Sequence, residues 1–224
     1  MTWRSMAEVV MRIVSGGDIS DDNPLDPREI YLWIAAAIPA LNYEYAHERR
    51  AVEPAWNSFD ASQYMTLHNL KVKKDEYRDR HYISLPVKPM ILYGAGTPQV
   101  VYSKDEAMTF TYREANLNAV VAATGNDKYN PNIPYWLESV GDDDRLYFTR
   151  DIGECCDVEH LVVRLIPGSF SEVPGNGVSE ECIDQDSAIP VHPSKLGKLQ
   201  TQVLQLAGAL DKEPEDIVND GVNG

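Results

Sequence analysis

Large apolar residues near the end of the chain recur at intervals of three and four positions. This spacing places them on one face of a helix, with glutamine and threonine side chains on the other faces. A narrow apolar face of this kind has to pack against another helix. Two interpretations stay open, which are a core helix of this chain and a helix that also contacts a neighbouring subunit. The residues of this face are Leu196, Leu199, Val203, Leu206 and Leu210.

Two further helices are predicted near the N-terminus. Residues 2–14 place apolar side chains at helical spacing, and Thr2 can cap the first turn. The second helix begins at Asp26-Pro27, where aspartate suits the N-cap and proline the first helical position. This helix is apolar on more than one side, which predicts the central helix of a bundle. Its core residues are expected to include Trp33, Ile34 and Ile38.

From residue 51 to residue 190 the helical spacing gives way to short β-like runs, separated by Gly, Pro, Asn and Asp. The charged stretch 73–80 predicts a short helix or an exposed turn, and the stretches 125–134 and 170–186 predict long polar loops. The predicted strands are Tyr64–Lys71, His81–Leu85, Met90–Leu92, Gln99–Tyr102, Thr109–Tyr112, Ala119–Ala123, Leu146–Phe148 and His160–Ile166.

Helices at both ends of a β-rich stretch predict an α+β fold. We expect residues 1–57 and 187–210 to form a helical bundle, with residues 58–186 as an inserted, mainly antiparallel β region. Residues 211–224 form an acidic tail in which Ile217 and Val218 stand among acidic residues. This tail is either a frayed terminus or a segment that becomes ordered on a partner.

The charge of the chain excludes some classes of partner. The net charge is −15 and the sequence pI is about 4.6. Wrapping nucleic acid or binding an anionic membrane surface requires a basic face, so neither is expected. The longest apolar run, Tyr31–Ile38, is far shorter than a membrane span. Three cysteines without an apolar leader segment indicate reduced thiols in a cytoplasm.

Metal sites and catalytic sites need particular residue types at particular spacings. Cys155, Cys156 and His160, with Cys182 and His192 at a distance, could be a metal half-site. Adjacent cysteines point to opposite sides of an extended chain, which suits a tetrahedral site poorly. The run 142–144 is three aspartates, but it lacks the alternating ligands of a calcium loop and is expected to be an acidic loop. Gly94-x-Gly96 is expected to form a turn. No catalytic residue, metal or cofactor is therefore predicted.

Short stretches in both ends of the chain and in the middle resemble a family of viral proteins. These are Met1-Thr2-Trp3, Ser15-Gly16-Gly17, Asp26-x-Arg28-Glu29-Ile30, Tyr82-Ile83-Ser84-Leu85-Pro86, Ile189-Pro190-Val191 and the tail from Pro214 to Asp220. In these stretches the chain resembles small virion proteins of crAss-like, podovirus-type tailed bacteriophages. The resemblance implies a head-to-tail connector, or adaptor, assembled in the host cytoplasm. This connector is a ring of about a dozen copies in the neck between portal and tail.

The resemblance also implies partners. They are other copies in a homo-oligomeric ring, the portal protein, adjacent tail or ring proteins, and genomic DNA that passes an acidic lumen without sequence-specific binding. The bundle residues would support the subunit and its neighbour. The portal-docking segment would comprise Glu213, Pro214, Asp216, Ile217, Val218 and Asn219. Two alternatives remain, which are another virion component, such as a tail or capsid accessory protein, and an enzyme that uses Cys155, Cys156 and His160.

Overall fold

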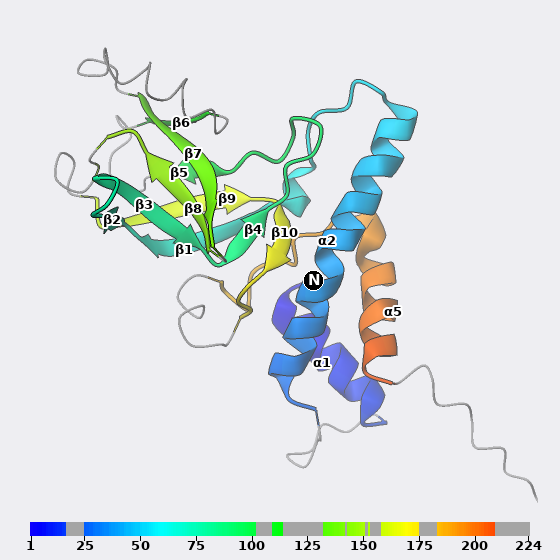
Figure 1. Ribbon diagram of the computed structural model, residues 1–224. Helices are drawn as coiled ribbons and strands as arrows, with labels where there is room; N and C mark the ends of the chain where they lie inside the picture. The colour runs from blue at the N-terminus through cyan, green and yellow to red at the C-terminus, as the bar shows by residue number, and fades with distance from the viewer. Residues whose placement is uncertain are drawn as a thin grey trace, which may run out of the picture.

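The chain folds into a helical part and a β-rich part that lie side by side (Figure 1). The computed structural model describes residues 1–16, 25–101, 109–113, 132–141, 143–150, 152, 158–174 and 183–208. Helices from both ends of the chain pack together, and a mostly antiparallel β region is formed by the residues between them. The predicted α+β fold is confirmed.

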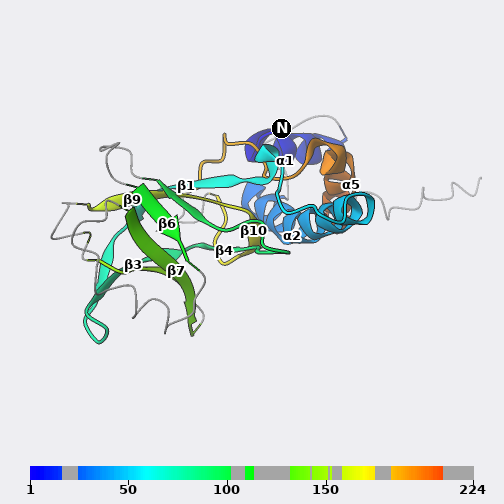
Figure 2. The same cartoon turned by 90° about the horizontal axis from the view of Figure 1, so that it is seen from above.

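Three helices form the helical part. They are α1 (Trp3–Val14), α2 (Pro27–Val52) and α5 (Leu196–Leu206), and the 3-10 turn η4 (Pro193–Lys195) leads into α5. Seen from above, each helix lies against the other two (Figure 2). The predicted caps are present, since Thr2 accepts a hydrogen bond from Ser5 N–H at 3.1 Å and Asp26 accepts one from Arg28 N–H at 2.9 Å. These caps satisfy N–H groups that a helix start leaves without partners.

The described strands form three sheets. The largest has the order β2-β3-β8-β7-β6, in which only β6 and β7 run parallel. A second sheet has the order β1-β9-β5, and β10 pairs with β4 in the third. A short 3-10 turn, η1 (Ala61–Gln63), precedes β1. The strands are β1 (Met65–Lys71), β2 (Lys73–Asp75), β3 (Arg80–Leu85), β4 (Val87–Pro89), β5 (Gln99–Val101), β6 (Thr109–Tyr112), β7 (Asn132–Val140), β8 (Asp143–Phe148), β9 (His160–Leu165) and β10 (Pro167–Phe170).

One hydrophobic core runs through both parts of the molecule. It contains the buried faces of α1, α2 and α5 together with inward-facing residues of the β region. Trp3 is fully buried and meets Tyr31 of α2 and Phe170 of β10 edge-on, with ring centroids 6.4 and 5.7 Å apart. Edge-to-face packing of this kind adds to the stabilisation from burial. The Trp3 ring therefore joins the helices to the β region.

A buried hydrogen-bond chain is a second connection between the two parts. Asn42 of α2 is fully buried, and its amide donates to Pro190 O at 3.0 Å. Its side-chain oxygen accepts from the Gln63 amide, also at 3.0 Å. Buried polar groups need such partners, because each unpaired one costs about 1–3 kcal/mol. Through Asn42, the segment after α2 (at Gln63) and the segment before α5 (at Pro190) are both held against α2.

The outer face of the largest sheet carries aromatic rings covered by arginines. Tyr82, Tyr147 and Trp136 lie opposite one another on three adjacent strands. The Arg78 guanidinium lies 5.0 Å from the Tyr147 ring centroid and pairs with Glu138 in a two-pronged contact. The Tyr147 hydroxyl donates to Asp75 at 2.9 Å. Each of these polar groups forms a hydrogen bond or an ion pair with another residue of this face, so the face stabilises the sheet.

The predicted strands are partly correct. The prediction at 109–112 is confirmed, and those at 64–71, 81–85, 99–102, 146–148 and 160–166 overlap observed strands. Residues 90–92 form no strand, because Pro89 ends β4 and the chain then turns. Residues 119–123 lie outside the described residues.

Three loop or turn predictions are wrong in part. Residues 73–75 form strand β2 although they are charged, because β2 pairs with β3 at the sheet edge, where the side chains of Lys73 and Lys74 stay in water. Residues 76–79 form the predicted exposed turn. Residues 132–134 begin β7, where Pro134 precedes the stretch that pairs with β8, which starts at Tyr135. Asp143 and Asp144 begin β8 after a turn at Gly141, instead of forming an acidic loop. Proline and charged residues are uncommon in strands, so the sequence pattern did not indicate a strand at these positions.

Candidate functional site

The outer face of α2 is exposed but carries no charged side chain over about four helical turns. No charged residue occurs between Glu29 and Glu44, a stretch of about 20 Å along the helix axis. Within this stretch Leu32 and Tyr43 are 51% and 49% exposed. Ala36 and Ala40 lie between them on the same side and are exposed as well. Exposed helix faces are normally polar, so this face suits a protein contact.

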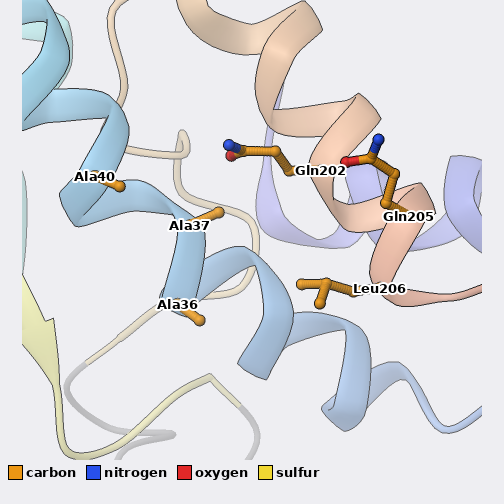
Figure 3. Close-up of a pocket in the computed structure, with 6 residues that line it drawn as sticks. All are labelled: Ala36, Ala37, Ala40, Gln202, Gln205 and Leu206. Atoms are coloured by element: carbon orange, nitrogen blue, oxygen red, sulfur yellow. The ribbon is translucent and has the colours of Figure 1, made fainter.

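A groove between α2 and α5 adjoins this face (Figure 3). Its volume is about 590 Å³, and its α2 wall consists of Ala36, Ala37 and Ala40. From α5, Gln202 and Leu206 extend toward α2, and Gln205 completes the lining. The three small alanine side chains leave the space open. A neighbouring side chain or backbone can therefore approach the helices closely.

Two features of the groove favour an occupant. Leu206 is 56% exposed, which leaves much of a large apolar side chain in water. The Gln202 Oε1 atom is buried and has no hydrogen-bond partner in the described part of the chain. A buried acceptor without a partner is costly, and an N–H donor entering the groove would satisfy it.

The prediction that Leu206 belongs to the buried face of α5 is wrong. Leu199, Val203 and Leu204 are buried, and Leu196 is partly buried against the same core. At about 100° per residue, Leu204 and Leu206 lie on opposite sides of Val203. Because α5 packs against both α1 and α2, its buried face is wide and is rotated toward Leu204. Leu206 is thereby left on the groove, and Leu210 lies outside the described residues.

Ion pairs hold α5 and the turn before it against α2. The largely buried Lys195 ammonium contacts Glu44 at 2.9 Å and Glu48 at 2.6 Å, and Lys198 also pairs with Glu44. Hydrogen bonds from Lys195 and Lys198 lower the pKa of Glu44 to about 2. Burial works against the charged form of Lys195, but its hydrogen bonds to Glu44 and Glu48 outweigh this and raise its pKa. This cluster fixes the geometry of one end of the groove.

The Glu44 cluster predicts a specific loss of stability in acid. The folded-state pKa of Glu44 lies below its ordinary value of 4.5, so its contribution is fully present above pH 4.5. It is lost as the pH falls from 4.5 to about 2. We expect the urea midpoint of Glu44→Gln to lie below that of the wild type at pH 6, with the difference disappearing near pH 2. A difference that stays constant over this range would contradict the assignment.

The structure describes some of the other predicted site residues and not the rest. Ile34 and Ile38 are fully buried in the common core, and Trp33 is partly buried against it. The predicted portal-docking residues 213–219 and all three cysteines lie outside the described residues, so these predictions stay predictions. His160 begins β9, whereas His192 stacks on Tyr45 at a centroid distance of 4.3 Å. Within the described ranges no group of three or more His, Cys, Asp or Glu side chains could hold a metal.

Sequence reasoning missed the groove itself. The run Ala35-Ala36-Ala37, with Ala40 a turn later, was a signal for close approach of another element. Alanine favours any helix, however, so the run alone does not show which side is open. The exposure of Leu206 depends on the rotation of α5, and only the packing of α1 against it reveals that rotation.

Comparisons with known proteins give no family for this chain. No protein-family profile matches the sequence, and no curated protein matches it. None of the helices in the described ranges has the length and apolar character needed to cross a membrane.

Proposed function

We propose that the chain is a structural virion protein, a subunit of an oligomeric ring that connects the portal of a tailed bacteriophage to its tail. The observation that carries this proposal is the uncharged outer face of α2, with the groove beside it. In a single chain this face exposes Leu32, Tyr43 and, across the groove, Leu206. A contact between copies would remove these side chains from water.

The distribution of charge supports a contact through the helices. Residues 1–57 and 187–210 carry seven basic and nine acidic side chains, whereas the whole chain has a net charge of −15. Most of the repulsion between identical copies therefore originates in the β region and the tail. Copies that meet through the helical part bring little like charge together. The same distribution would leave acidic surface elsewhere, which suits a channel that DNA passes without binding.

The portal and the neighbouring tail proteins enter the proposal through the resemblance of the chain's ends to virion proteins of crAss-like phages. A different virion component, such as a tail or capsid accessory protein, is the second candidate. It would use the same apolar face, but a decoration protein does not have to form a closed cyclic oligomer. The symmetry of the assembled protein separates the two candidates.

Placing a charge on the face tests the proposal. Ala40→Glu should leave the fold intact, because Ala40 is exposed and glutamate is a good helix former. It should shift the native mass from a closed oligomer toward the monomer, since the carboxylate would be buried in the contact. Native mass spectrometry at several protein concentrations measures this shift.

Ala61→Glu is the matched control, because Ala61 is exposed and lies in η1, away from the face. This variant should assemble as the wild type does. The proposal fails if the wild-type chain remains monomeric at high concentration both alone and with the portal protein present. It also fails if Ala40→Glu and Ala61→Glu assemble equally well.

A further inference from the structure

The turn between β4 and β5 holds an aromatic side chain in a strained backbone conformation. Tyr93 has a φ of +56°, and Gly94 beside it has a φ of +80°. Leu92 and Ala95 close the turn with hydrogen bonds of 3.0 and 2.8 Å between their backbones. Positive φ at both central positions is usually provided by Asn, Asp or Gly. A tyrosine in this conformation is strained, and such strain is typical of positions whose side chain has a function.

Tyr93 belongs to a small exposed cluster at the C-terminal end of α2, which we call the tyrosine patch. It consists of Tyr43, His47, Arg50 and Tyr93. The Tyr93 hydroxyl lies 3.3 Å from His47 Nε2, and the Tyr43 and His47 rings meet edge-on at 4.5 Å. The Arg50 guanidinium lies 3.9 Å from the Tyr93 ring centroid. Tyr43 and Tyr93 are 49% and 41% exposed, so the rings remain accessible.

Among the described residues, no carboxylate forms an ion pair with the arginine of the patch. Arg49 pairs with Glu53, and Glu44 and Glu48 pair with Lys195. Arg50 contacts the Tyr93 ring, and no ion pair to a carboxylate joins it within the described ranges. The patch therefore combines an available guanidinium with two exposed tyrosines. Arginine and tyrosine are the residues that most often carry binding energy at protein interfaces.

We propose that the tyrosine patch binds the acidic C-terminal segment Glu213–Asp220 of a neighbouring copy. Ile217 and Val218 would contact the two tyrosine rings, and the Asp216 carboxylate would pair with Arg50. Residues 211–224 hold five acidic side chains and one basic, so their charge is opposite to that of the patch. The nine residues from Gly208 to Ile217 can span about 30 Å. Leu206 at the end of α5 lies beside Ala36, which is about 20 Å along α2 from Arg50, so a tail of this length can reach the patch of a copy packed alongside.

The patch continues the outer face of α2. Tyr43 belongs to both, and His47 follows it one helical turn later. The inference rests on the proposed ring, because adjacent α2 faces would bring the tail of one copy close to the patch of the next. Such a contact joins two different surfaces, and repeated around an axis it closes a ring. It assigns the tail to a neighbouring copy in place of the portal contact that the resemblance implies.

Photo-crosslinking in the full-length chain tests the assignment. Tyr93 is replaced by p-benzoylphenylalanine, and the assembled protein is irradiated, digested and analysed by mass spectrometry. We expect a crosslink to residues 213–220 in a band of dimer mass. Arg50→Glu in the same protein should lower the crosslink yield several-fold, because it replaces a favourable ion pair with repulsion between like charges.

The matched control carries the same probe at Tyr77, which is almost fully exposed and lies in the β2–β3 turn. It should give no tail crosslink. A crosslink in a band of monomer mass, or a crosslink to another segment, overturns the assignment to a neighbouring tail. If the protein has the native mass of a closed oligomer but forms no tail crosslink, the inference fails while the proposed ring stands. If it stays monomeric, the ring itself fails.

Discussion

Val203→Asp is expected to destabilise the chain strongly enough to unfold it. Val203 is fully buried on the face that α5 turns toward α1 and α2. Val203 belongs to the hydrophobic core cluster, so a carboxylate placed there would be packed among apolar side chains. Burying such a group costs more than about 4 kcal/mol, a large part of the stability of a typical domain. Circular dichroism at 222 nm should show a loss of helix and a lowered melting temperature.

Leu206→Asp is the control on the same helix. Leu206 is 56% exposed, so aspartate there remains in water and the melting temperature should change little. Native mass should still report weaker assembly, because Leu206 lines the groove. Equal melting temperatures for the Val203 variant and the wild type would contradict the burial of Val203 between the helices.

Trp3→Ala is expected to destabilise the whole chain in a single transition. Removal of a fully buried aromatic side chain costs about 3–5 kcal/mol, which combines lost burial with the cavity left behind. The Trp3 ring touches both α2 and β10, so helical and β signals should fall together in urea. Two separate transitions in this variant would instead show that the helices and the β region unfold independently.

Trp3→Phe distinguishes the contribution of the ring contacts of Trp3 from the effect of its unpaired indole N–H. The Trp3 Nε1 atom is buried and has no hydrogen-bond partner among the described residues. Phenylalanine keeps most of the ring contacts and removes that unpaired donor, so its cost should be well below that of alanine. A loss as large as that of Trp3→Ala would indicate that the indole nitrogen has a partner in the protein.

The architecture could be predicted because local signals agreed with one another. Thr2 and Asp26 are typical capping residues, and the apolar repeats that follow them have helical spacing, so both helix starts are where the sequence placed them. The run at 160–165 has four apolar residues, two of them adjacent valines, and forms the central strand of its sheet. In each case propensity, pattern and packing favour the same structure.

The remaining features depend on contacts between distant segments. Strand β7 contains Pro134 and follows a polar stretch, so only its pairing with β6 and β8 makes it a strand. The α2/α5 groove depends on how α5 is rotated about its axis. The apolar spacing alone put Leu206 on the buried face, whereas in the structure Leu204 is buried and Leu206 is exposed. The tyrosine patch joins residues about 45 positions apart. No local pattern reports such contacts, because they are set by the assembled fold.

The order of elements along the chain has a consequence for synthesis on the ribosome. Lys195, which holds the turn before α5 against α2, lies 151 residues after its partner Glu44. At about 5–20 residues per second, α2 would leave the ribosome roughly 10–30 s before α5 can cover it. During this interval the faces of α1 and α2 that α5 later buries are open to solvent and to other nascent chains. The first 50 residues are therefore where a chaperone would have most to protect.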